Sequence, residues 1–246
     1  AYEDAVCLPV AYGTALRMML AATGFVYGKE NIGLVNSTGC STVYASTYPY
    51  NPYLVPWTNS LFENAPADAM GIRARWDQMG WKNKQLWVIG GDGDMLSIGG
   101  NHLIHALRRN VGIKIVMFNN QIYGLTKGQY SPTSRVGQVT KSTPVGSVDT
   151  PFNPVSLALG AEATFVARAM ESDRAELTGI LRAAAEHRGT ALVGDPQRRT
   201  QHLHLPRPVL AQLPAARHQV GPGVDVVAGV AHHRGLARGA AGGVDA

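Results

Sequence analysis

Three compact apolar runs constrain the fold of this chain more than any other feature of its sequence. They occupy residues 31–35 (NIGLV), 86–89 (LWVI) and 113–118 (IKIVMF). Short runs of this kind are typical of parallel strands that are covered on both faces of a sheet. Apolar residues at helical spacing surround them, at 14–22, 64–79, 95–110 and 171–187. Because strands alternate with helices, we expect an α/β fold with a doubly wound, mostly parallel sheet.

The size and composition of the chain indicate a globular protein. It has 246 residues, 45% of them hydrophobic, which is enough to bury a core without disulfides. Its two cysteines, Cys7 and Cys40, exclude a disulfide framework. No stretch approaches the ~20 apolar residues of a membrane-spanning helix, and residues 1–10 lack the pattern of a secretory signal. We therefore expect a cytoplasmic protein that does not bind membranes.

The positive charge of the chain is concentrated near its end. Of the net +5, residues 194–246 carry six basic and three acidic side chains, and they contain no Lys, Glu or aromatic residue. Such a segment buries little surface to offset the entropy of ordering its backbone. We therefore predict one domain over residues 1–193 and a poorly ordered tail over 194–246, which a reading-frame shift in a GC-rich gene would explain. The remaining charge gives no reason to expect a nucleic-acid partner.

Polar residues follow two of the predicted strands directly. The run at 86–89 leads into Gly-Asp-Gly at 91–93, and the run at 113–118 leads into Asn119 and Asn120, with residues 94–118 between them. In open α/β sheets the ligand crevice lies at the carboxyl ends of the strands, so both motifs should face one cleft. Glycine permits close approach of the backbone to an anion, and carboxylate and amide oxygens suit Mg²⁺. The sequence therefore predicts a diphosphate and Mg²⁺ site, although each motif taken alone also marks an ordinary turn.

A longer resemblance rests on these motifs. Gly-Asp-Gly followed at this distance by Asn-Asn is similar to the thiamine-diphosphate motif. The runs GDGDMLSIGGNHLIHALRRN and FNNQIYGLTKGQYSPTS resemble the β subunit of 2-oxoacid:ferredoxin oxidoreductases of the 2-oxoglutarate type. The segments STGCSTVYASTYP and WTNSLFENA are closer to the pyruvate type, so the substrate stays open between 2-oxoglutarate and pyruvate. The resemblance covers about residues 5–193.

The resemblance implies roles for individual residues. Asp92, Asn120 and the carbonyl of Ile122 would bind Mg²⁺. The residues around the cofactor would be Gly91, Gly93 and Asp94 at the diphosphate, and Thr38, Gly39 and Cys40 beside the thiamine. Leu125 would lie near the reactive carbon. Lys127 would meet the diphosphate or the distal carboxylate of a dicarboxylic substrate, or it is simply a solvated lysine of the loop.

The resemblance also implies partners and a [4Fe-4S] cluster. The α subunit would supply the Glu that activates the cofactor, and ferredoxin and coenzyme A would accept the electrons and the acyl group. The family holds its cluster with four cysteines, whereas Val10 takes the place of the second cysteine after Cys7. Cys7 and Cys40 would be the residual ligands, and a cubane cluster normally needs four.

Three functions therefore stay open. The first is the β subunit of a heterooligomeric oxidoreductase that converts a 2-oxoacid to an acyl-CoA and reduces ferredoxin. The second is a thiamine-diphosphate decarboxylase or carboligase without iron–sulfur electron transfer, which the missing cysteines favour and the GLTKGQYSPTS run disfavours. The third is a non-catalytic remnant that still folds.

Overall fold

The computed structural model describes residues 2–45, 50–51, 53–169, 173–196 and 225–227, with the backbone alone at 2–12, 44–45, 195–196 and 225–227. The described strands form one sheet in the order β2-β1-β3-β4-β6-β5-β7, and all neighbouring strands are parallel. Their bounds are β1 Ile32–Ser37, β2 Trp57–Ser60, β3 Gln85–Gly91, β4 Lys114–Asn119, β5 Phe165–Arg168, β6 Ala191–Pro196 and β7 Asp225–Val227. The predicted α/β class with a parallel sheet is confirmed.

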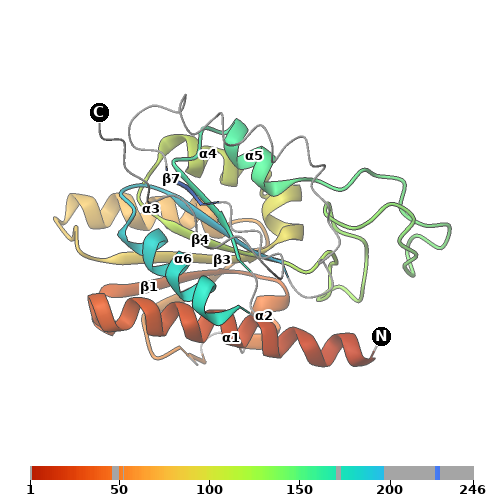
Figure 1. The fold of residues 1–246 in the computed structure, drawn as a ribbon, viewed down its shortest axis with the longest axis horizontal. Coiled ribbons are helices and arrows are strands. Elements are labelled where there is room, and N and C mark those ends of the chain that lie inside the picture. The colour runs from red at the N-terminus through yellow and green to blue at the C-terminus, as the bar shows by residue number, and fades with distance from the viewer. Residues whose placement is uncertain (1, 46–49, 52, 170–172, 197–224, 228–246) are drawn as a thin grey trace, which may run out of the picture.

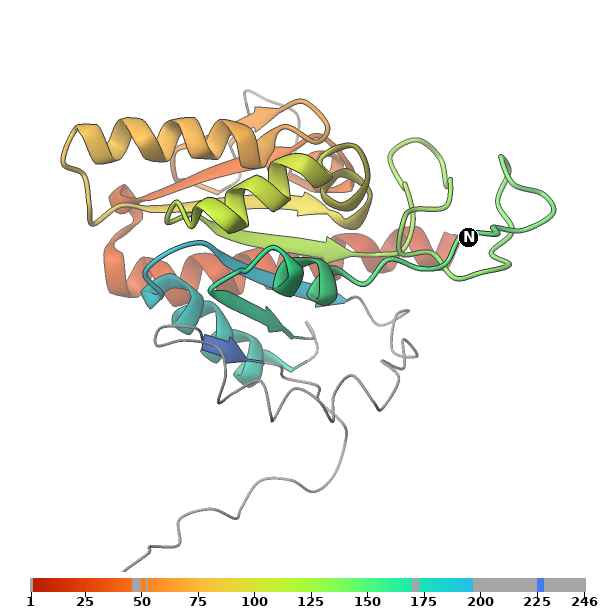
Figure 2. The same ribbon diagram turned by 90° about the horizontal axis from the view of Figure 1, so that it is seen from above.

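Helices cover both faces of the sheet (Figures 1 and 2). One face carries α1 (Tyr2–Tyr27), α2 (Cys40–Ala45) and α6 (Arg174–Glu186), which contact one another through α1. The opposite face carries α3 (Ala65–Gln78), α4 (Gly100–Arg109) and α5 (Pro154–Gly160), which pack in that order. Two short turns complete the described elements, a 3₁₀ turn at Lys29–Asn31 and a π-helical turn at Asp94–Ile98.

The core consists of two apolar layers, one on each side of the sheet. Along β3, Leu86 and Val88 belong to the layer under α3 and α4, whereas Trp87 and Ile89 belong to the layer under α1 and α6. This alternation follows from the two-residue repeat of a strand. Both sets are almost fully buried, so the middle of β3 contacts helices on both faces.

The three strands expected from the apolar runs exist, with bounds shifted by one to two residues at most ends. The helix expected at 95–110 is instead divided: the π-helical turn ends at Ile98, and α4 begins at Gly100. The Gly99 amide donates to the Asp94 carbonyl, and a Cβ on Gly99 would lie 2.5 Å from that oxygen. The division therefore depends on the glycine.

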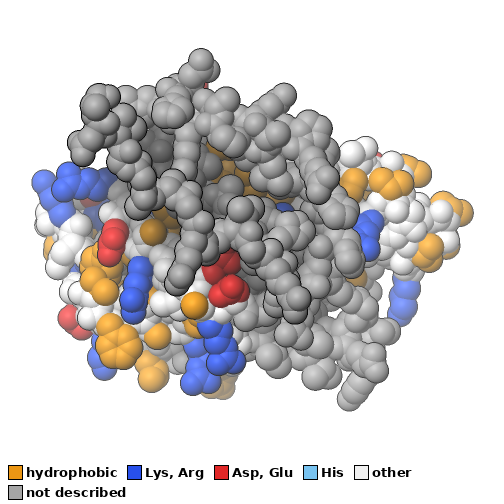
Figure 3. All heavy atoms as spheres, viewed as in Figure 1, with side chains coloured by type: hydrophobic (Ala, Val, Ile, Leu, Met, Phe, Trp, Pro, Cys, Tyr) orange, Lys and Arg blue, Asp and Glu red, His pale blue; other side chains and the backbone are white. Residues whose placement is uncertain are grey.

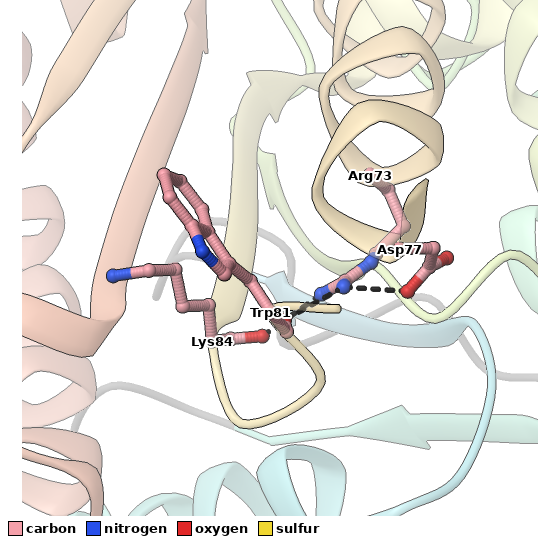
Figure 4. A network of polar contacts seen from close by, with 4 residues as sticks. All are labelled: Arg73, Asp77, Trp81 and Lys84. Atoms are coloured by element: carbon pink, nitrogen blue, oxygen red, sulfur yellow. Dashed lines mark hydrogen bonds and ion pairs between the residues drawn. The ribbon is translucent and has the colours of Figure 1, made fainter. Parts of the chain in front are cut away.

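The turn from α3 into β3 is held by one buried arginine (Figure 4). The Arg73 guanidinium donates to Asp77 Oδ1 at 2.6 Å and to the carbonyls of Trp81 and Lys84, each at 3.0 Å. The Lys84 ammonium lies 5.0 Å from the centre of the Trp81 ring. These contacts fix the chain just before β3, the strand that leads into the Gly-Asp-Gly motif.

The segment between β4 and α5 projects from the body of the molecule (Figures 1 and 2). Hydrophobic side chains gather on the projection at the right of Figure 3, and its exposed valines are Val136, Val139, Val145 and Val148. The segment is nevertheless ordered by hydrogen bonds, since the Gly137 amide donates to the Ser147 carbonyl and the Ser147 amide to the Gln138 carbonyl.

The predicted domain boundary after Val193 falls inside β6. The ladder between β4 and β6 continues to the pair Asn119–Pro196, so the strand extends three residues beyond the boundary. Residues 225–227 of the predicted tail form β7 beside β5. Residues 197–224 and 228–246 lie outside the described residues, so the predicted poor order of the tail stays a prediction.

Candidate functional site

A pocket with about 430 Å³ of empty space lies at the carboxyl ends of β1, β3 and β4. Because these strands are parallel and adjacent, the residues that follow each of them meet at one edge of the sheet. The lining contains most of the residues predicted for the cofactor, and its members are Gly39, Cys40, Ser41, Phe62, Gly91, Asp92, Gly93, Asp94, Asn120, Ile122, Tyr123, Gly124, Leu125 and Thr126.

The Asp92 carboxylate is fully buried at this edge. Its Oδ2 accepts hydrogen bonds from Ser131 Oγ at 2.5 Å and from Thr133 Oγ1 at 2.6 Å, and its Oδ1 accepts one from the Asn120 amide at 3.2 Å. Burial raises the pKa of Asp92, and these hydrogen bonds oppose the rise. Asp92 and Asn120 therefore lie side by side, as the spacing of their motifs predicts.

Asp94 is the second buried carboxylate of the pocket. It is 3% exposed, and neither of its carboxylate oxygens has a hydrogen-bond partner of acceptable geometry. Burial raises the pKa of Asp94 to about 7, the nearby Ser37 hydroxyl and Gly91 amide limit the rise, and the charge of Asp92 adds to it. Both acidic side chains of the pocket are therefore buried, and burial disfavours the charged form of each.

Asn120 and Cys40 meet across the pocket. Asn120 Nδ2 donates to Cys40 Sγ at 3.6 Å, and Asn120 Oδ1 accepts from the Ile122 amide at 3.3 Å. A Cβ on Gly124 would lie 2.8 Å from the Cys40 sulfur, so the thiol closely approaches the backbone after Ile122. Asn120 thus contacts both the residue after β1 that opens α2 and the segment after β4, and Asp92, Asn120 and Ile122 all line the same pocket.

The ring of Tyr123 packs directly against the backbone of Gly93 in the pocket. A Cβ added to Gly93 would meet ring atoms at 2.4 Å, and the Tyr123 hydroxyl donates to the Gly93 carbonyl at 3.2 Å. Phe62 packs against the same ring, with 6.0 Å between the ring centres. These two aromatic residues form an apolar wall of the pocket that the sequence did not predict.

Three predicted residues stand apart from this arrangement. Thr38 is outside the lining, and its hydroxyl donates to the Ser60 carbonyl at 2.6 Å, which ties β1 to β2. Lys127 is exposed and also outside the lining, on a backbone with φ 79°. Cys7 lies in the first part of α1, residues 2–12, of which the backbone alone is described.

The residues present fit a divalent cation with a diphosphate. Among the described side chains, no cation pairs with Asp92 or Asp94, and two adjacent buried carboxylates are costly without one. Mg²⁺ takes one or two carboxylates together with phosphate and water oxygens. Asp92, Asn120 and the carbonyl of Ile122 supply such donors, and Asp94 is a further buried acid of the same pocket.

Comparison with known families agrees with this geometry. Residues 37–194 match the model of the thiamine pyrophosphate enzymes, C-terminal TPP binding domain. The chain belongs to this family. The matched region begins at the end of β1 and ends within β6, so it includes every strand end that contributes to the pocket.

The curated relatives carry the names that the resemblance implied. The chain is 60% identical over 166 residues to the 2-oxoglutarate oxidoreductase subunit KorB of Mycobacterium tuberculosis, covering 67% of this chain and 42% of that protein. It is 45% identical over 167 residues to the 2-oxoacid:ferredoxin oxidoreductase subunit beta of Saccharolobus solfataricus, covering 67% of this chain and 51% of that protein. The chain thus spans about half the length of these relatives. The predicted resemblance is confirmed.

Solved structures give the same fold. The 2-oxoglutarate:ferredoxin oxidoreductase from Magnetococcus marinus, with 2-oxoglutarate, coenzyme A and succinyl-CoA bound, aligns at a TM-score of 0.66 and 32% identity. The match covers 77% of this chain and 61% of that one. Benzoylformate decarboxylase from Polynucleobacter necessarius, at 16% identity and a TM-score of 0.53, covers 74% of this chain and 32% of that one and shares the fold. No helix in the described part of the chain is long and apolar enough to cross a membrane.

Proposed function

We propose that the chain acts as the thiamine-diphosphate-binding part of a 2-oxoacid:ferredoxin oxidoreductase β subunit. The observation that carries the proposal is a pair of buried carboxylates, Asp92 and Asp94, that no described Lys or Arg side chain pairs with, in the pocket that Asn120 also lines. The names of the relatives support a 2-oxoacid substrate, and that of the Mycobacterium tuberculosis protein favours 2-oxoglutarate.

In this proposal each side chain has a stated task. Asp92 Oδ1, Asn120 Oδ1 and the Ile122 carbonyl hold Mg²⁺, and the backbone at Gly91 and Gly93 leaves room for the diphosphate. Leu125, 43% exposed at the pocket, forms the apolar surface beside the reacting carbon. Thiamine diphosphate, when bound, stabilises the carbanion that loss of CO₂ leaves on the substrate.

The proposed partners follow from the relatives. A protein named as a β subunit has an α subunit, and we propose that this partner supplies the Glu that activates the cofactor. The carboxylates that line the described pocket, Asp92 and Asp94, are both buried and belong to the proposed diphosphate end. Coenzyme A and ferredoxin complete the proposed reaction as acceptors of the acyl group and of the electrons.

The cysteines of this chain do not fit a [4Fe-4S] cluster. A cubane normally takes four thiolates, whereas the sequence has two cysteines and Val10 three positions after Cys7. Among the described side chains, no group of three His, Cys, Asp or Glu residues is placed to hold a metal. Cys40 instead lies against Asn120 in the proposed thiamine pocket. We therefore assign no electron-transfer step to this chain.

This misfit favours a second candidate function, a thiamine-diphosphate decarboxylase or carboligase that works without an iron–sulfur centre. Iron and acid-labile sulfide measured on anaerobically purified αβ complex distinguish the two candidates. We expect less than one cluster equivalent for each chain of this sequence. Four iron and four sulfide per chain would instead restore the full oxidoreductase proposal for this subunit.

Calorimetric titration with thiamine diphosphate in the presence of Mg²⁺ and the α subunit tests the proposed site. We expect Asp92→Ala and Asn120→Ala to weaken cofactor binding by at least about 30-fold, or roughly 2 kcal/mol, because each removes a metal ligand. Asp173→Ala, which removes a carboxylate that caps α6 by accepting from the Glu176 amide, is the matched control and should bind normally. Unchanged binding in both site variants would refute the assignment.

A further inference from the structure

The segment after β4 places two hydroxyl groups beneath the proposed metal ligand. Ser131 Oγ and Thr133 Oγ1 both donate to Oδ2 of Asp92, while Oδ1 accepts one backbone amide, that of Asn120. A carboxylate oxygen has about two lone-pair directions. Oδ2 is therefore saturated, and Oδ1 keeps one lone pair for a cation.

The two hydroxyl groups are fixed in place. Ser131 is 2% exposed and Thr133 is fully buried. The Ser131 amide donates to Ser134 Oγ at 2.8 Å, and Ser134 Oγ donates to the Gln121 carbonyl at 2.7 Å. This ties the segment to the residue that follows Asn120, so neither hydroxyl can turn toward solvent.

Thr133 also connects the two ends of the motif. Its Oγ1 lies 2.8 Å from Asn119 Oδ1 as well as 2.6 Å from Asp92 Oδ2, so these two acceptors share its single hydrogen. One hydroxyl thus bridges the residue after β3 and the last residue of β4, two strands that are already paired. The Asn120 amide holds the other oxygen of the same carboxylate, so Asp92 is anchored on both oxygens.

We propose that Ser131 and Thr133 are positioning residues that turn the Asp92 carboxylate so that Oδ1 faces the cation. The inference rests on the proposed function, because it assumes that Asp92 holds Mg²⁺. Groups that orient a metal ligand typically contribute 10–100-fold to metal affinity. A purely structural role for these hydroxyls would lower stability and leave the cation dependence unchanged.

The test uses calorimetry to follow thiamine-diphosphate binding to the αβ complex as the Mg²⁺ concentration is varied. The measured quantity is the Mg²⁺ concentration at which this binding is half-maximal. Thr133→Val should raise that concentration about tenfold, and Ser131→Ala should raise it in the same direction. Thr133→Ser, which keeps the hydroxyl, should remain within about twofold of the wild type. Electron paramagnetic resonance of bound Mn²⁺ gives a second measure of affinity that does not depend on turnover.

Thr190→Val provides the matched control. Thr190 is also a fully buried threonine, and its hydroxyl donates to the Ala106 carbonyl, far from the pocket in the fold. If Thr133→Val and Thr190→Val need the same Mg²⁺ concentration for half-maximal cofactor binding, the inference is overturned. If Asp92→Ala nevertheless loses cofactor binding, the positioning role is wrong and the proposed function is retained. If Asp92→Ala also binds the cofactor normally, the proposed function is wrong as well.

Discussion

Asp94→Asn is expected to stabilise the cofactor-free chain at pH 8 by roughly 3–4 kcal/mol. Burial raises the pKa of Asp94 from 3.8 to about 7, which is about three pKa units, and each unit corresponds to about 1.36 kcal/mol. The Ser37 hydroxyl and the Gly91 amide lie near the carboxylate without making a hydrogen bond of acceptable geometry, and an amide is neutral at every pH. The substitution therefore removes a buried charge at little structural cost.

The sign of the pH dependence follows from proton binding. Between pH 4 and pH 7 the folded chain keeps a proton on Asp94 that the unfolded chain releases. The free energy of unfolding should therefore fall as pH rises through this window and stay low above it. Asp94→Asn should lack this component, so the two proteins should agree near pH 4 and diverge toward pH 7.

Urea unfolding of the chain at a series of pH values between 4 and 8 measures the effect. Asp149→Asn is the control. It removes one acidic charge at an exposed carboxylate, which accepts a hydrogen bond from the Tyr130 hydroxyl, and so shows how much the free energy of unfolding changes when a charge is lost at the surface. A difference between wild type and Asp94→Asn that is the same at pH 4 and pH 8 would contradict the expectation. A stable Asp94→Asn protein with weakened cofactor binding would show that the site retains this charge for function.

The sequence predicted three adjacent strands of the sheet and missed the other described strands, among them the interior strands β5 and β6. The apolar runs at 31–35, 86–89 and 113–118 became β1, β3 and β4 because strands buried on both faces need apolar residues at every position. The edge strand β2 went unpredicted since its residues, Trp57–Ser60, are half-buried and mostly polar. The short helix α5 was also missed, although Asn153 caps it and Pro154 begins it.

The residues of the site also divide into some that the sequence could predict and some that it could not. Asp92 and Asn120 could be paired from sequence because each follows a buried strand directly, and parallel strands bring such positions together. Ser131, Thr133 and Tyr123 could not, since they lie in an irregular segment whose path depends on hydrogen bonds to Asp92, Gln121 and Gly93. The hydroxyl-rich SPTS run was a signal, but only the fold shows where those hydroxyls point.

The second large effect is expected at Lys114, at the opposite end of β4. Lys114 is 3% exposed, and its ammonium donates to the carbonyls of His187 and Gly189, at 2.5 and 2.8 Å. Burial lowers the pKa of Lys114 to about 8, and the positive charge of Arg73 adds to the shift. The unfolded chain therefore holds a proton between pH 8 and 10.5 that the folded chain releases, so stability should rise with pH in this window by roughly 3 kcal/mol.

Lys114→Met should remove this rise, since methionine does not titrate. Unfolding in guanidinium chloride at pH 7.5, 9 and 10 measures the difference between the two proteins, which should change by roughly 2 kcal/mol or more across the series. Lys82→Met is the control, because it removes the charge of an exposed lysine in the turn before β3 and so measures the effect of losing a surface charge on the free energy of unfolding. A constant difference between wild type and Lys114→Met would contradict the prediction. Because Lys114 and Asp94 lie at opposite ends of the sheet and titrate with opposite slopes, combining Lys114→Met with Asp94→Asn should give additive effects.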